Sequence, residues 1–535
     1  MSDLLPDLVY RQAERAADSI ALIAGREQLT YGALAERIAG FARAVLQAGL
    51  APGERVAVFL DKRVETVVAK FGAAAAGCTF VPINPLFRPR HVGHVLRDCD
   101  VRILVTTADR LAVVAEAIAG CPALSLVVLV DGRGEEVALP AGSSARVLDL
   151  PQFLAEVSGC SRAPHRRIDA DMTAIFYTSG STGMPKGVVL SHRNMVTGAR
   201  SVASYLRNVP EDRLLAALPL SFDAGFSQLT TAFTVGASVV LLNYLMPRDV
   251  IDAIHRHGVT GLTGVPPLYI QLSRAAWPTP AAPTLRYVAN TGGRMPRATL
   301  DRLRALLPEA EVFLMYGLTE AFRSTYLPPS EVDRRPDSIG KAIPNVEIMV
   351  VNAEGAPVAP GEEGELVHRG PLVSLGYWND PARTAERFRP APGQPPELCL
   401  PEIAVWSGDV VKTDEEGYLY FVGRRDDMIK TSGNRVSPTE IEEVVHATGL
   451  VAEVAAIGAP HDSLGQGVVL YVSAVDGAGV DVDALLAECR RQLPVYMVPQ
   501  EIRVRSSLPR NANGKVDRSL LRDDARDAFA GREGG

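Results

Sequence analysis

Residues 177–187 read YTSGSTGMPKG and contain almost nothing that a hydrophobic core could use. The apolar run at 174–177 predicts a strand, and the hydroxyl and glycine residues after it predict a loop whose N–H groups could surround a phosphate. The loop is not of the Walker A type, because Pro185 stands where that motif has the glycine before its lysine. Taken alone, the stretch fits a phosphate-binding loop or a flexible turn. Its candidate ligands are Thr178, Ser179, Gly180, Ser181, Thr182, Gly183 and Lys186.

Six further segments have residue types suited to nucleotide chemistry. They are LTYGALAERI (29–38), YGLTE (316–320), GELVHRGPLVSLGYWND (364–380), WSGD (406–409), GRRDDMIKTSGNRVSPTEIE (423–442) and NANGKVDR (511–518). With the stretch at 177–187 they resemble, in order, the signatures of the adenylate-forming superfamily, which includes acyl-CoA synthetases, luciferases and nonribosomal peptide adenylation domains. The resemblance covers about residues 20 to 520. The segments LPLSFDAGFSQLTTAF and MYGLTEAFRSTYLPP also resemble stand-alone acyl-CoA ligases associated with exosortase-A systems in bacteria.

The resemblance implies a reaction in two steps. A carboxylate attacks the α-phosphate of ATP and pyrophosphate leaves, and a thiol then captures the acyl-adenylate. Such an enzyme must gather a carboxylate and a polyphosphate, so it needs cations and hydrogen-bond donors rather than a nucleophile. We therefore expect ATP, Mg²⁺ and a small-molecule carboxylic acid as ligands. The expected thiol is CoA or a separate phosphopantetheinylated acyl or peptidyl carrier protein, because no carrier segment follows Arg518.

The resemblance assigns a role to each nucleotide-binding motif. The loop at 178–183 and Lys186 would hold the β- and γ-phosphates, and Asp409 with Arg424 would bind the ribose hydroxyls. Thr319 and Glu320 would contact the α-phosphate, and the Glu320 carboxylate would also be the Mg²⁺ ligand. The adenine would lie against Tyr316 and the glycines Gly292 and Gly293.

The C-terminal motifs imply a moving domain. Lys515 would reach the carboxylate and the α-phosphate during adenylation, presented by the turn at 511–514. Asp426 matches the hinge about which the small domain rotates for thiol capture. After the rotation, Gly433 would leave room for a pantetheine arm, Lys430 would lie close by, and Arg435 would bind phosphate.

The identity of the acid is less constrained. The resemblance places the acid pocket at Phe222, Asp223, Gly225, Gly264 and Arg323. Amino-acid-activating members commonly have an aspartate in the FDA pattern, which pairs with the substrate ammonium, so Asp223 favours an amino-bearing acid. Arg323 could instead pair with Asp223, which would neutralise it or make a polar site for a hydroxylated or acidic substrate. Amino-acid adenylation and activation of a plain acyl chain both stay open.

The elements that must position these residues predict an α/β fold. Strand-like runs at 54–60, 79–84, 102–107 and 124–130 alternate with helical periodicity at 63–76, 90–98 and 108–119, and the rhythm returns at 213–290. Segments 131–170, 278–284 and 388–402 read as loops. We expect a large N-terminal α/β domain with parallel-sheet subdomains, 1–425, and a small mobile α+β domain, 426–535, with helices at 438–447 and 481–493 and strands at 451–459 and 467–475.

The composition and the N-terminal sequence limit which binding partners and which cellular location we expect. The 535 residues are 47% hydrophobic and 22% charged, with a net charge of −7 and no basic run, so we expect globular domains and no nucleic acid partner. The N-terminus lacks the pattern of a signal peptide, and no run of about 18 apolar residues occurs, which predicts a cytoplasmic protein without a membrane segment. Six cysteines without a CxxC motif predict reduced thiols and no zinc site.

Two further functions stay open. A catalytically idle relative would bind ATP or an acyl ligand as a sensor, but we would expect it to have lost the charges at Lys515, Glu320 or Asp409, and all are present. An enzyme that stops at the acyl-adenylate would be favoured by an insertion that restrains the domain rotation, and none is evident at 423–445.

Overall fold

The computed structural model describes residues 3–132, 139–140, 142–156, 163–178, 184–425, 427–431, 434–461, 464–475, 479–493, 495–511 and 514–529; of residues 430, 434 and 435 it describes the backbone. The chain forms two compact units, Met1–Ile348 with His368–Trp406, and Met349–Val367 with Ser407–Gly535. The boundary predicted between residues 425 and 426 marks the hinge of a domain rotation, whereas these two units are defined by their compactness. The predicted boundary therefore stays a prediction. Within the described ranges, no helix is both long and apolar enough to cross a membrane.

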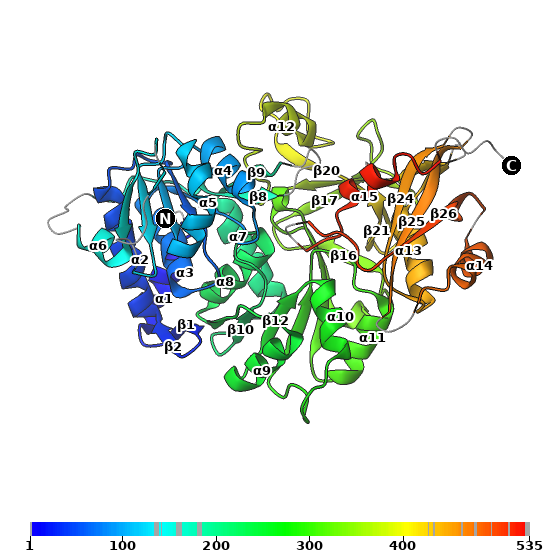
Figure 1. Ribbon diagram of the computed structural model, residues 1–535, viewed down its shortest axis with the longest axis horizontal. Helices are drawn as coiled ribbons and strands as arrows, with labels where there is room; N and C mark the ends of the chain where they lie inside the picture. The colour runs from blue at the N-terminus through cyan, green and yellow to red at the C-terminus, as the bar shows by residue number, and fades with distance from the viewer. Residues whose placement is uncertain are drawn as a thin grey trace. The chain divides into compact units, whose positions relative to one another are not determined.

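One sheet of the first unit has the strand order β7-β6-β5-β3-β4-β8-β9. Its last two strands, β8 and β9, are labelled in Figure 1. Its strands are parallel except β9, which pairs antiparallel with β8. This hairpin carries the sequence YTSGSTGMPKG between its strands. The strands are β3 (Arg55–Val58), β4 (Thr79–Pro82), β5 (Ile103–Thr106), β6 (Leu126–Leu129), β7 (Arg146–Asp149), β8 (Met172–Thr178) and β9 (Lys186–Ser191).

A second sheet of this unit has the order β16-β15-β14-β13-β12-β10-β11-β1-β2. Its central strands are parallel, so their carboxyl ends meet at one edge, where ligands bind in open α/β sheets. The strands are β1 (Ile20–Ala24), β2 (Glu27–Thr30), β10 (Arg213–Ala216), β11 (Ser238–Leu241), β12 (Gly261–Gly264), β13 (Tyr287–Asn290), β14 (Glu311–Tyr316), β15 (Thr325–Leu327) and β16 (Ser338–Ala342).

A shared hydrophobic core joins the two sheets. Buried residues of both sheets pack with helices α2 (Tyr31–Gln47), α3 (Val64–Ala76), α7 (His192–Tyr205) and α8 (Asp223–Val235). A separate core lies under α4 (Pro89–Asp98) and α5 (Ala108–Ala119), against the first sheet. The remaining helices of the unit are α1 (Asp7–Ala16), α6 (Leu150–Ala155), α9 (Pro247–His257), α10 (Pro266–Arg274), α11 (Arg297–Leu306) and α12 (Pro381–Arg387), with 3₁₀ turns at η2 (Thr319–Ala321) and η3 (Pro329–Glu331).

Two segments differ from the expected loops. The stretch 131–170 contains β7 and α6, and 388–402 begins with β19 (Phe388–Pro390), which pairs with β20. The β7 strand is half exposed at the sheet edge, so it lacks the apolar run on which the prediction depended. Strand β12, sequence GLTG, was not predicted because its glycines are poor strand formers.

The second unit holds most of β17 (Glu347–Val351), β18 (Gly364–Arg369) and β20 (Ile403–Thr413), with β21 (Leu419–Arg424) antiparallel to β20. A further sheet has the order β23-β22-β25-β24, with β26 beside β25. Helices α13 and α14 pack on one face of this sheet and α15 on the other. The elements are β22 (Ile429–Thr431), β23 (Asn434–Val436), β24 (Val451–His461), β25 (Gly465–Ala474), β26 (Glu501–Arg505), α13 (Pro438–Ala447), α14 (Val482–Gln492), η4 (Val495–Met497) and α15 (Arg518–Ala525).

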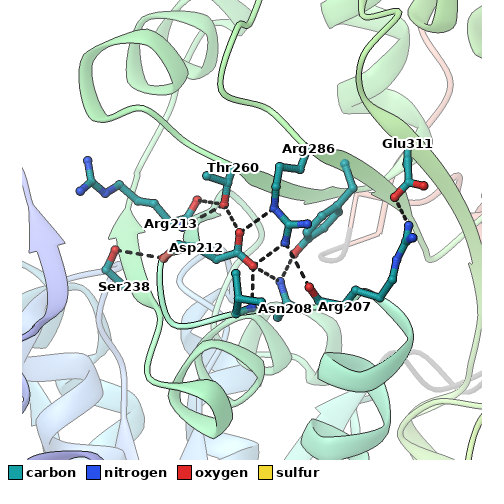
Figure 2. A network of polar contacts seen from close by, with 10 residues as sticks. Arg207, Asn208, Asp212, Arg213, Ser238, Thr260, Arg286 and Glu311 are labelled. Carbon is teal, nitrogen blue, oxygen red and sulfur yellow. Dashed lines mark hydrogen bonds and ion pairs between the residues drawn. The ribbon is translucent and has the colours of Figure 1, made fainter. Parts of the chain in front are cut away.

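A buried carboxylate holds together the amino-terminal edge of the second sheet (Figure 2). Asp212, just before β10, accepts hydrogen bonds from Arg286 at 2.9 and 2.6 Å, from Thr260 at 2.7 Å and from Asn208 at 3.0 Å. Burial acts to raise the pKa of Asp212, but the bonds from Arg286, Thr260 and Asn208 outweigh it and hold the pKa below its usual value. The network therefore fixes the starts of β10, β12 and β13, whose opposite ends carry the candidate site.

We expect Arg286→Met to lower the free energy of unfolding by about 1–3 kcal/mol, the scale for losing hydrogen bonds to a charged group. Because the Asp212 side chain is 1% exposed, water cannot replace the lost partner, although the half-exposed Arg286 moderates the loss. Urea unfolding would measure the change. The matched control is Arg248→Met, whose exposed pair with Asp252 is worth less than about 1 kcal/mol. Equal effects of the two substitutions would contradict the role of the network.

Candidate active site

Glu320, Lys186 and Tyr377 form a cluster of polar groups in the first unit. The Lys186 Nζ lies 3.0 Å from the Glu320 Oε1 and 2.8 Å from the Tyr377 hydroxyl, and this hydroxyl donates to the same Glu320 oxygen at 2.6 Å. Lys186 begins β9, and Glu320 lies in the 3₁₀ turn after β14. The structure thus brings together two predicted residues that are far apart in sequence, and it adds Tyr377, which lies in a quoted motif but had no assigned role.

The cluster keeps Glu320 anionic. Its side chain is 14% exposed. Burial acts to raise the pKa of Glu320, but the Lys186 ammonium and the Tyr377 hydroxyl outweigh it and lower the pKa to about 2. The site therefore holds a charged carboxylate beside an ammonium at the end of the hairpin that carries the loop 179–183. A carboxylate of this kind suits a hard cation, and the ammonium suits a phosphate oxygen.

The segment 217–222, between β10 and α8, is held by two lysines. The Lys62 Nζ donates to the Ala217 carbonyl and the Lys70 Nζ to the Leu220 carbonyl, each at 2.7 Å. Gly225 packs so closely under this segment that a Cβ would lie 1.7 Å from the Pro219 carbonyl oxygen, so only glycine fits there. The bare backbone of Gly225 is thus used for packing against the segment.

We expect Lys70 to make the stability of the protein depend on pH. Burial lowers the pKa of Lys70 to about 7, whereas it is about 10.4 in an unfolded chain. Between these values the unfolded state binds the extra proton, so stability rises with pH. From pH 7 to about pH 9, the free energy of unfolding should rise by about 2 kcal/mol more in the wild type than in Lys70→Met.

Urea unfolding at both pH values would measure this difference for Lys70→Met and for the exposed control Lys412→Met. Taking the difference between wild type and variant removes the contributions of the other titrating groups. A wild type and a Lys70→Met variant with the same pH slope would show that the ammonium stays charged in the folded state.

Asp223 and Arg323 face each other in the interior. Asp223 is the first residue of α8, and its Oδ1 accepts a hydrogen bond from the Thr319 hydroxyl at 3.1 Å. Its Oδ2 lies 3.5 Å from the Arg323 Nη1, and both side chains are almost entirely buried. The pairing, one of the alternatives left open by the sequence, balances the charge of Asp223. Phe222 directly precedes α8, and its carbonyl accepts from the Phe226 N–H at 3.0 Å.

The residues predicted to contact adenine lie at the carboxyl ends of β13 and β14, and Gly264, predicted for the acid pocket, ends the neighbouring strand β12. Gly264 and Tyr316 are the last residues of β12 and β14. Gly292 and Gly293 follow β13, and the Asn290 amide donates to the Gly293 carbonyl at 2.8 Å. The parallel register brings the ends of these strands to one edge, as the sequence predicted. Asn290, which fixes this turn, was not predicted.

Asp409 and Arg424 are paired in the second unit. The register of β20 and β21 sets the two residues opposite each other, and the Arg424 Nε lies 2.9 Å from the Asp409 Oδ1. The Asp409 side chain is buried, whereas the Arg424 side chain is more than half exposed. The structure therefore brings this predicted pair together at the surface of a sheet.

Lys515 lies at an exposed turn of the second unit. The Asn511 N–H donates to the Lys515 carbonyl at 2.8 Å, and the Asn511 side-chain oxygen accepts from the Lys515 N–H at 3.1 Å. Gly514 has a φ of +77°, which favours glycine. The following Arg518 binds both carboxylate oxygens of Glu442, at 2.6 and 2.8 Å, which anchors α15. Lys515 itself is exposed.

The remaining predicted site residues are described fully, described by their backbone alone, or lie outside the described ranges. The Thr178 side-chain oxygen at the end of β8 is buried and has no hydrogen-bond partner in the described ranges. Lys430 and Arg435 lie opposite each other on β22 and β23, with the backbone alone described. The residues outside the described ranges are Ser179, Gly180, Ser181, Thr182, Gly183, Asp426 and Gly433.

Comparisons with known proteins agree with this architecture. The sequence profile of the AMP-binding enzymes matches residues 9–378, and that of the AMP-binding enzyme C-terminal domain matches residues 440–515. The long-chain-fatty-acid–CoA ligase of Salmonella typhimurium is 32% identical over 550 residues, covering 98% of this chain and 94% of the ligase. The sulfoacetate–CoA ligase of Cupriavidus necator is 31% identical over 530 residues, 98% of each chain. ATP-bound MatB from Rhodopseudomonas palustris has a TM-score of 0.84 and 27% identity, covering 99% of this chain and 100% of MatB.

The fold and these matches define an adenylate-forming enzyme, as the motifs predicted. The chain belongs to the AMP-binding enzyme family, and it is an AMP-forming ligase of the acyl-CoA synthetase type. The narrower resemblance to ligases of exosortase-A systems stays a prediction.

Proposed function

We propose that the protein joins a carboxylic acid to CoA in two steps. The acid attacks the α-phosphate of ATP and releases pyrophosphate, and the CoA thiol then attacks the acyl carbonyl and releases AMP. The observation that carries this proposal is the pairing of Lys186 with an anionic Glu320 beside the phosphate-loop hairpin. The names of the relatives, which are CoA ligases of different acids, and the ATP bound to MatB support it.

In this proposal the first unit binds the phosphates and the base. The loop 178–183 and Lys186 hold the β- and γ-phosphates, Thr319 contacts the α-phosphate, and Tyr316 packs on the adenine beside Gly292 and Gly293. Glu320 would hold Mg²⁺, which neutralises phosphate charge when bound. Because Lys186 and Glu320 balance each other in the structure, an arriving phosphate would draw the ammonium away and release a Glu320 oxygen.

The second unit supplies the ribose contact and the mobile lysine. Asp409 and Arg424 bind the ribose, and Lys515 joins the carboxylate and the α-phosphate during adenylation. A rotation at Asp426 then exchanges Lys515 for the segment with Lys430, Gly433 and Arg435, which receives the thiol. The hydrogen bonds between Asn511 and the Lys515 backbone support this role, because they hold the backbone of the lysine while its side chain is exposed.

Acid-dependent exchange of pyrophosphate into ATP, measured with Mg²⁺ and without CoA, tests the first step. We expect exchange with a subset of carboxylic acids and none without an acid. Adding CoA should then give an acyl-CoA thioester, whereas a phosphopantetheinylated carrier protein without CoA should give none. Thioester on the carrier but not on CoA would replace the proposed acceptor, and absence of exchange with every acid would contradict the adenylation step.

A further inference from the structure

A small cavity lies beside Arg323, one of the residues predicted for the acid pocket, between α7, α8 and the strands β10, β12, β13 and β14. Its volume is about 10 Å³, measured for the centre of a water-sized sphere, which is room for about one water molecule. A cavity of this size takes about one non-hydrogen atom of a ligand, such as an oxygen, and has no room for an alkyl chain. Although the surrounding core is apolar, the cavity is lined in part by polar side chains. They are Ser227, Gln228, Thr231, Thr263 and Arg323.

Arg323 is poorly satisfied in this cavity. Its side chain is 3% exposed, and its Nη1 makes two long contacts, both 3.5 Å, to the Asp223 carboxylate and the Phe322 carbonyl. Its Nε is buried without a hydrogen-bond partner in the described part of the chain. Leaving such a donor unpaired is destabilising, and more so on a charged group. The cavity therefore lacks an acceptor atom next to the guanidinium.

The backbone before Arg323 is strained in the same place. Phe322 has a φ of +56°, an uncommon conformation for a residue with a bulky side chain, and it is wholly buried. Such strain is destabilising and persists only where the surroundings impose it. The strained backbone at Phe322 thus turns the Arg323 side chain inward. This agrees with a ligand-binding role for the unpaired Nε of Arg323.

The charges around the cavity favour an uncharged acceptor. Asp223 balances the positive charge of Arg323, and no other charged side chain lines the cavity among the described residues. A second anion on the substrate would be repelled by Asp223, and an ammonium would be repelled by Arg323. A hydroxyl or keto oxygen accepts a hydrogen bond without adding charge, and a hydroxyl can also donate to the hydroxyls of Ser227 or Thr231.

We propose that the acid is short and carries an uncharged oxygen, as a hydroxyl or keto group, a few bonds from its carboxylate, and that Arg323 donates a hydrogen bond to this oxygen. The inference rests on the proposed function, because it names the class of acid for the same site. It distinguishes this chain from an enzyme for long alkyl chains and from one for amino acids.

The test is pyrophosphate exchange with four-carbon acids that differ at one group. The panel comprises butyrate, β-hydroxybutyrate, γ-hydroxybutyrate, acetoacetate, succinate and γ-aminobutyrate, with dodecanoate as the long chain. We expect kcat/KM for at least one hydroxy or keto acid to exceed that for butyrate by about 100-fold or more, since a site built to bind an oxygen rejects the analogue that lacks it. The charged analogues and dodecanoate should be weaker still.

Variants then assign the preference to Arg323. Arg323→Met alone would leave the Asp223 carboxylate buried without a partner, so the informative variant is the double change Asp223→Asn with Arg323→Met. We expect it to reduce the preference for the oxygenated acid by about 10-fold or more while changing butyrate less. Arg297→Met, which removes a half-exposed arginine of the same unit, should leave the preference unchanged.

The outcomes separate the inference from the proposed function. Exchange with butyrate or dodecanoate as well as with the oxygenated acids would overturn the inference and leave the ligase function intact, and it would indicate that the cavity holds a water. Preference for succinate or γ-aminobutyrate would overturn the assigned charge balance. Absence of exchange with every acid would contradict the proposed function itself, and the inference with it. The wild-type panel decides between these outcomes even where a variant fails to fold.

Discussion

Lys515→Ala is expected to lower acid-dependent pyrophosphate exchange by about 10²–10⁴-fold, the range for losing a positioned charged group in a transition state. Because the ammonium would act when the carboxylate attacks the α-phosphate, the loss should lie in kcat for adenylation. Formation of acyl-CoA from a supplied acyl-adenylate should change by less than about 10-fold, because in the proposed mechanism the thiol step would use a different arrangement of the second unit. Both rates can be measured on the same preparation.

The control for Lys515 is Lys412→Ala, which removes another exposed lysine of the second unit. We expect this variant to retain both half-reactions. Lys515→Arg keeps the charge but not the shape of the ammonium, and it should recover part of the exchange activity. If Lys515→Ala slowed both half-reactions equally, the lysine would have a structural role rather than a role in adenylation.

Glu320→Gln is expected to lower exchange by about 10²–10³-fold, the scale for removing one preorganised electrostatic group from an active site. The amide has the shape of the carboxylate but not its charge, and the pKa of Glu320, about 2, means that the charge is present at every working pH. The variant should also need a higher Mg²⁺ concentration for half-maximal rate. A titration of exchange rate against Mg²⁺ measures both effects.

Tyr377→Phe provides the matched control for Glu320. It removes an uncharged hydroxyl that donates to the same carboxylate oxygen and accepts from Lys186, and it leaves the charges of Glu320 and Lys186 and the ring in place. We expect it to lower exchange by less than about 10-fold and to leave the Mg²⁺ dependence nearly unchanged. A Glu320→Gln variant with the Mg²⁺ dependence of the wild type would refute the metal-binding role.

The alternating elements of the first unit were predictable because parallel strands buried on both faces must be apolar throughout. The predicted helices 63–76 and 108–119 correspond to α3 (Val64–Ala76) and α5 (Ala108–Ala119). In the second unit, the predicted helix 438–447 is α13 (Pro438–Ala447). Among the elements that sequence reasoning did not predict, β7 and β12 are short, half exposed or rich in glycine, and the sheet stabilises them more than their own residues do.

By itself, the sequence determined the class of enzyme and the order of its motifs, because YTSGSTGMPKG, YGLTE and NANGKVDR are local patterns of residue types that resemble those of a known family. It did not determine the partners of those residues. Only the tertiary structure placed Tyr377 on the carboxylate of Glu320 and paired Asp223 with a buried Arg323. These contacts join residues tens to a hundred positions apart, and their energies depend on burial and distance, which no local pattern contains.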